Sequence, residues 1–160
     1  MATQKIEFLI QWEAMNKETT RVYVDSTVVS GMFDYHLPER ITQTKLFWDA
    51  VQRGEFAIIV SSVQRDEMMD APQYVREFYN DLPVSQIERI ESTEESDNLA
   101  MQYVDAKVIS KNHLNDCRHI AIASIAQADA VVSWNCNDMV NPNRIPKYNE
   151  VNEKNGYKKN

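Results

Sequence analysis

Glycine is scarce in this chain, which has only three glycines among its 160 residues. Phosphate-binding loops need several glycines at fixed spacing, because their backbone must turn sharply and approach the phosphate closely. Neither a P-loop nor a dinucleotide-binding fingerprint can be drawn anywhere in the sequence. This absence excludes the two commonest nucleotide-binding uses of an α/β sheet.

Cysteine is equally rare, and long apolar runs are missing. The two cysteines, Cys117 and Cys136, form no CxxC motif and no zinc-finger spacing, so a reducing compartment suits them. We expect both to be small buried side chains. No apolar run is long enough to span a bilayer, and the N-terminus lacks the pattern of a secretory signal. We therefore expect a cytoplasmic protein with no membrane partner.

The chain also lacks an excess of basic residues. Its 17 lysines and arginines stand against 24 acidic residues, which gives a net charge of −7. This balance argues against broad electrostatic binding to nucleic acid, since domains that bind phosphate usually carry a basic face. It does not exclude a metal-dependent nuclease, because carboxylates that hold divalent cations add negative charge and the cations supply the positive field.

What the sequence does contain is an alternation of short apolar strands and helices. Its clearest unit begins at Asn112, which can cap a helix that is almost entirely apolar after His119, and continues into residues 130–133 as an inner parallel strand. The other predicted elements are strands over 21–24, 56–60 and 86–90, the last at an edge, and helices over 38–53, 63–70, 72–80 and about 93–110. The expected helix caps are Ser26 or Thr27 after the first strand, Ser61 or Ser62 after the second, and a capping box of Ser92 and Glu95 for the helix over 93–110. This order predicts an α/β fold with a mainly parallel central sheet of four to five strands, covered by helices on both faces.

The two ends of the chain differ from this pattern. Residues 1–20 carry scattered apolar positions and then a polar stretch, which leaves open whether they are an N-terminal extension or a peripheral element. Residues 143–160 are polar and are interrupted by Pro146 and Gly156, which predicts a polar C-terminal tail. The α/β domain itself is expected over residues 21–142.

Three acidic residues occupy equivalent places in this pattern. Asp25 follows the first strand, Glu67 lies just past the second, and Asp116 lies in the first turn of the helix that feeds the last strand. In a parallel sheet these positions meet at one edge. Convergent carboxylates repel one another unless a cation neutralises them, and oxygen ligands suit Mg²⁺ or Mn²⁺. Taken singly, each residue is more simply a helix cap or a solvated charge.

Four stretches of the sequence resemble the motifs of the PIN-domain nucleases, in the same order, over about residues 22–141. They are Tyr23 to Val28, Ser61 to Glu67, Asn115 to Ala121, and Ala128 to Asn135. The resemblance implies a PIN-like three-layer α/β/α fold over residues 21–142. It also implies an Mg²⁺- or Mn²⁺-dependent endoribonuclease that hydrolyses RNA phosphodiester bonds with metal-activated water. Such enzymes are most often VapC-type toxins of toxin–antitoxin pairs.

The resemblance also implies roles for individual residues and partners. Asp25, Glu67 and Asp116 would be catalytic and would hold the metal, with Asn135 as a fourth, neutral ligand where the family has an acid. Ser26 or Thr27 would position the metal-bound water. Beside these ligands, Asp138 could replace the missing fourth acid if its loop turns inward, and His119 could support the site, although a hydrogen-bonded packing histidine is the simpler interpretation. The expected partners are an RNA substrate, a cognate antitoxin and a second copy of the chain.

Two alternatives stay open at this point. Asn135 replaces an acid, and Thr27 stands where the family usually has asparagine, so the chain could be a degenerate PIN domain that binds RNA or a protein without cleavage. A receiver-like signalling domain is the other alternative. It is disfavoured because no paired acids follow the first strand and no lysine follows the last.

Overall fold

A computed structural model describes residues 19–82 and 87–157, so almost all of the 1–20 segment lies outside the described residues. The elements, in chain order, are β1 (Thr20–Val24), α2 (Ser26–Ser30), the 3₁₀ turn η1 (Gly31–Phe33), α3 (Pro38–Gln52), β2 (Phe56–Ser61), α4 (Ser62–Met69), α5 (Gln73–Asn80), β3 (Ile87–Ile90), α6 (Glu94–Asp105), the 3₁₀ turn η3 (Lys111–His113), α7 (Leu114–Ile125), β4 (Ala130–Val132) and α8 (Ile145–Lys154).

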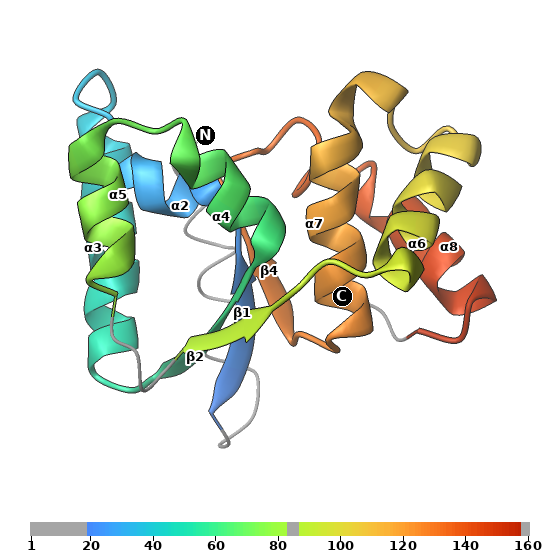
Figure 1. The fold of residues 1–160 in the computed structure, drawn as a ribbon, viewed down its shortest axis with the longest axis horizontal. Coiled ribbons are helices and arrows are strands. Elements are labelled where there is room, and N and C mark those ends of the chain that lie inside the picture. The colour runs from blue at the N-terminus through green and yellow to red at the C-terminus, as the bar shows by residue number, and fades with distance from the viewer. Residues whose placement is uncertain (1–18, 83–86, 158–160) are drawn as a thin grey trace.

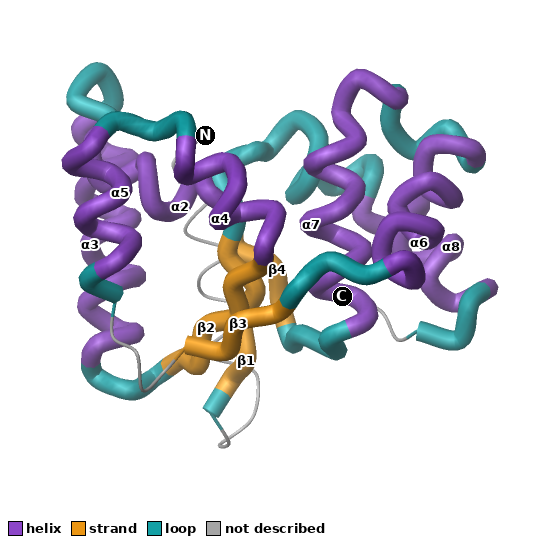
Figure 2. The backbone as a smooth tube through the Cα atoms, viewed as in Figure 1, coloured by secondary structure: helices purple, strands orange, loops and turns teal. Residues whose placement is uncertain are grey.

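The four strands form one parallel sheet in the order β3-β2-β1-β4. Figure 1 shows the sheet between two groups of helices, with α2, α3 and α5 on one side and α6, α7 and α8 on the other. The tube in Figure 2, coloured by secondary structure, shows the same three layers. The predicted α/β class, the parallel sheet and its coverage on both faces are therefore confirmed. No helix in the described ranges is long and apolar enough to cross a membrane.

The alternation of side chains along the strands creates two separate cores. Val22 and Val24 of β1 pack with α2, α3 and α5, whereas Tyr23 between them packs with α6, α7 and α8. Successive strand residues point to opposite faces, so a strand that is apolar on both faces must be covered on both. The continuous apolar runs in β1 and β2 arise for this reason.

The strand β4 lies at an edge of the sheet, not inside it as the sequence predicts. It pairs only with β1 in the described sheet. Val131 nevertheless belongs to one core, and Ala130 and Val132 belong to the other. The apolar composition of β4 reflects burial of both of its faces. From sequence alone, an edge strand that is buried on both faces cannot be distinguished from a central strand.

Several helix starts also differ from their predictions. The N-cap of α2 is Asp25, whose side chain accepts from the Thr27 amide, and not Ser26 or Thr27. The capping box of α6 joins Thr93 to Ser96, one residue after the predicted start, and α7 begins after η3 without a side-chain cap. Any short polar side chain can fill these positions, so a one-residue error is easily made.

The C-terminal segment contains a helix that the sequence analysis did not predict. Helix α8 buries Tyr148, Val151 and Asn152 against the core beside α6 and α7. Pro146 lies in its first turn, where proline is compatible with a helix. Three buried positions on one face are enough to dock a helix that is otherwise polar.

Candidate active site

Asp25 lies at the carboxyl end of β1 and is 2% exposed. Its Oδ1 accepts hydrogen bonds from the amide of Thr27 (3.1 Å) and from the Thr27 hydroxyl (2.5 Å). Its Oδ2 accepts one from the hydroxyl of Ser133 (2.7 Å), which follows β4. The Thr27 hydroxyl in turn accepts from the amide of Trp134 (2.8 Å). Thr27 therefore connects Asp25 to the segment after β4. The neighbouring Ser26, the first residue of α2, is half-buried.

The surroundings of Asp25 act in opposite directions on its pKa. Burial raises the pKa of this carboxyl above its ordinary value. The nearby His119 and the hydroxyls of Thr27 and Ser133 lower the pKa, and the charge of Glu67 raises it. Asp25 and Glu67 are therefore close enough to interact electrostatically, as the prediction of one shared edge requires.

Glu67, on α4, ends a chain of hydrogen bonds that runs into the core. Its Oε1 lies 2.5 Å from Nε2 of His119, on α7. Nδ1 of His119 lies 2.6 Å from the hydroxyl of Tyr23, which lies 2.7 Å from Oγ of Ser61. His119 and Tyr23 are buried, whereas the Glu67 side chain is 31% exposed. Burial raises the pKa of Tyr23 well above its usual range. His119 thus orients a candidate ligand and does more than fill the core.

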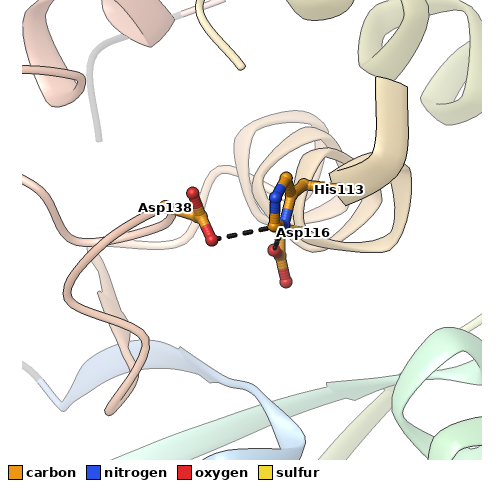
Figure 3. A group of neighbouring side chains, drawn as sticks. All are labelled: His113, Asp116 and Asp138. Carbon is orange, nitrogen blue, oxygen red and sulfur yellow. Dashed lines mark ion pairs between the residues drawn. The ribbon is translucent and has the colours of Figure 1, made fainter. Parts of the chain in front are cut away.

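Asp116 belongs to a second group, drawn in Figure 3. Nδ1 of His113 lies 3.5 Å from Oδ2 of Asp116 and 3.3 Å from Oδ2 of Asp138. One ligand atom from each of these three residues lies within 4.8 Å of the other two. The side chain of Asn135 hydrogen-bonds to Asp116, and its Oδ1 accepts from the Asp138 amide (3.1 Å). Asn135 therefore holds the two acids near each other.

Burial and repulsion by the charge of Asp138 raise the pKa of Asp116. Burial makes the larger contribution, and the charge of Asp138 adds to it. The hydrogen bond with Asn135 and the nearby His119 and His113 lower the pKa. A bound divalent cation would lower the pKa of Asp116, because the cation stabilises the charged form of both carboxyls.

Helix α8 and the residue before it hold Asp138 in this position. Nη1 of Arg144 lies 2.9 Å from Asp138 Oδ1, and the Tyr148 hydroxyl donates to the Asp138 carbonyl (2.9 Å). Neither residue was predicted, because both lie in the segment expected to be a polar tail. The available signal was the spacing of apolar Ile145, Tyr148 and Val151 at three-residue intervals.

The predicted site residues thus form two neighbouring groups. Asp25 and Glu67 interact electrostatically, and Asp116 lies in the close group with His113 and Asp138. His119 contacts Glu67 and is close enough to Asp25 and Asp116 to lower the pKa of each. Among the residues that the structure describes, Asp25, Glu67 and Asp116 do not form a group as close as that of His113, Asp116 and Asp138.

The two cysteines differ in exposure, which corrects the expectation that both are buried. Cys117 is buried in α7 and Cys136 is exposed. Burial raises the pKa of the Cys117 thiol to about 12. Because the thiolate is the reactive form, Cys117 should react slowly at pH 8.

We therefore expect one fast-reacting thiol per chain when the native protein is treated with a disulfide reagent at pH 8, and two in denaturant. The variant Cys136→Ser should lose the fast reaction. Two fast thiols in the native protein would contradict the burial of Cys117.

No protein-family model, curated protein or solved structure matches this chain.

Proposed function

We propose that this protein is a divalent-metal-dependent endoribonuclease whose catalytic centre lies at the carboxyl ends of β1 and β4. The observation that carries the proposal is the close group of His113, Asp116 and Asp138, beside the pair of Asp25 and Glu67. Side chains that could hold a cation gather where open α/β sheets usually carry their chemistry.

The donor atoms of the close group fit a divalent cation. Asp116 and Asp138 offer carboxylate oxygens, and Asn135 hydrogen-bonds to the Asp116 side chain and to the Asp138 backbone amide. His113 offers an imidazole nitrogen, a ligand that Mg²⁺ rarely uses and that transition metals accept. This donor set favours Mn²⁺ over Mg²⁺. Asp138 also pairs with Arg144, which holds one of its oxygens away from a cation.

The chain's own residues prepare the rest of the site. A bound cation would supply Lewis acidity toward a phosphodiester and would lower the pKa of water. Thr27 and Ser133 fill three of the acceptor positions on Asp25, which leaves one lone pair on Oδ2 for a further donor or cation. His119 holds the exposed end of Glu67 toward the same region.

The choice of RNA as the substrate comes from the resemblance of four sequence stretches to PIN-domain nucleases. From the same resemblance, we propose that the protein acts in the cytoplasm as a toxin, that a cognate antitoxin inhibits it, and that it forms a homodimer. These proposals agree with an acidic chain, because a cation can supply the positive charge that an RNA phosphate needs.

The test uses the native protein and end-labelled single-stranded RNA of mixed sequence. We expect cleavage with Mn²⁺, slower cleavage with Mg²⁺ and none with EDTA. Titration calorimetry with Mn²⁺ should give saturable binding. RNA that is retained but not cut, together with no Mn²⁺ binding, would contradict the proposal and favour the alternative of a PIN-like domain that only binds.

A further inference from the structure

The buried hydrogen bonds that link Ser61 to Glu67 run in one direction, in which each group donates to the next. Ser61 is the first donor. In the part of the chain that the structure describes, Ser61 Oγ has two hydrogen-bond partners, the Tyr23 hydroxyl and the amide of Gln64. The amide can only donate. The proton of the Ser61 hydroxyl therefore goes to the oxygen of Tyr23.

The direction continues from Tyr23 to the histidine. Because the Tyr23 oxygen accepts from Ser61, its own proton is available for Nδ1 of His119, 2.6 Å away. A nitrogen that accepts a hydrogen bond carries no proton, so the ring proton of His119 lies on Nε2. That proton is donated to Oε1 of Glu67, 2.5 Å away.

We propose that Tyr23 is a positioning residue that acts through His119. Its hydroxyl fixes the Nε2–H tautomer of the imidazole, and this tautomer is the one that can hold the Glu67 carboxylate as a hydrogen-bond acceptor. The hydroxyl lies one buried side chain away from Glu67 and takes no direct part in ligand binding. The inference rests on the proposed function only in taking Glu67 as part of the cation site.

Because His119 is buried, its tautomer affects where the Glu67 carboxylate lies. His119 is 1% exposed, so water cannot easily replace a lost hydrogen-bond partner at Nδ1. Without the Tyr23 hydroxyl, the two neutral tautomers would be closer in energy. The Nδ1–H form presents a lone pair to Glu67, which repels the carboxylate and moves it from its place.

The experiment measures the tautomer directly. In ¹⁵N-labelled protein, long-range ¹H–¹⁵N spectra of the imidazole rings separate the two forms, and His119→Gln assigns the signal of His119 among the three histidines. We expect the native ring to be protonated on Nε2. In Tyr23→Phe, the ratio of the Nε2–H to the Nδ1–H form should fall about tenfold, as the loss of one buried hydrogen bond implies.

A second measurement links the tautomer to the site. The affinity for Mn²⁺ should fall about tenfold in Tyr23→Phe, as for other hydrogen-bond partners of residues that support a metal. Tyr157→Phe is the control, because it also removes a tyrosine hydroxyl, one that donates to Glu95 on α6. It should change neither the His119 tautomer nor the Mn²⁺ affinity.

Different measurements would contradict the assignment of Tyr23 and the proposed function. A native His119 protonated on Nδ1, or a ratio unchanged in Tyr23→Phe, would overturn the assignment of Tyr23. An unchanged Mn²⁺ affinity in a variant whose tautomer has shifted would also overturn it. Absence of Mn²⁺ binding by the native protein would instead overturn the proposed function, and the ring spectra would still decide whether Tyr23 fixes the tautomer.

Discussion

Asp116→Asn is expected to abolish measurable Mn²⁺ binding and to reduce RNA cleavage about a thousandfold, the order expected when the group that holds a catalytic charge is lost. Asp116 belongs both to the close group with His113 and Asp138 and to the set of acids around His119. The substitution removes its charge with little change in volume. Cleavage rates and calorimetry at a fixed Mn²⁺ concentration measure the two effects.

The folded state should tolerate this substitution. Burial and the charge of Asp138 raise the pKa of Asp116, so the ionised carboxylate destabilises the metal-free protein at neutral pH. Asp116→Asn should therefore be at least as stable as the native chain in thermal unfolding without metal. Asp81→Asn, at the exposed end of α5, is the control and should leave cleavage unchanged. Native Mn²⁺ affinity in Asp116→Asn would contradict the proposed site.

Asn152→Ala should lower the free energy of unfolding by about 3 kcal/mol, the sum expected for a buried cavity and the loss of partners by buried polar groups. Asn152 is 0% exposed on α8. Its Oδ1 accepts from the hydroxyl of Tyr103, and its Nδ2 donates to Ser124 Oγ (3.1 Å). These contacts join α8 to α6 and α7. Urea unfolding followed by circular dichroism measures the change.

A double-mutant cycle tests whether this effect comes from the hydrogen bond. Tyr103→Phe and Asn152→Ala should be non-additive by about 1 kcal/mol, because each removes one partner of the same bond. Tyr157→Phe is the control, since its hydroxyl donates to the exposed Glu95, and it should change stability by less than about 0.5 kcal/mol. Full additivity of the first two variants would show that the hydrogen bond between Tyr103 and Asn152 does not contribute to the free energy of unfolding.

Helix α8 is expected to affect Mn²⁺ binding as well as stability. Arg144 and Tyr148 hold Asp138, so a loosened α8 should also weaken Mn²⁺ binding in Asn152→Ala. The sequence of this segment predicts a tail because its polar residues outnumber its apolar ones. Burial of three residues on one helical face depends on the surface that faces them, which a local reading of the sequence does not contain.

The sequence by itself determined the local structure. The apolar runs of β1 and β2, Pro38 at the start of α3 and a serine cap for α4, either Ser61 or Ser62, were predicted, because strand composition and helix capping depend on neighbouring residues. The structure shows that this cap is Ser61. It also predicted that Asp25 and Glu67 would lie at the same edge, since parallel strands bring their carboxyl ends together.

Only the tertiary structure decided how the site residues are paired. Asp25 meets Ser133, 108 residues away, and Glu67 meets His119, 52 residues away. The sequence grouped Asp116 with Asp25 and Glu67, but the structure places it closest to His113 and Asp138. It also moves β4 to the edge of the sheet. Such contacts depend on how helices settle on the sheet, and many arrangements share the same local pattern of apolar and polar residues.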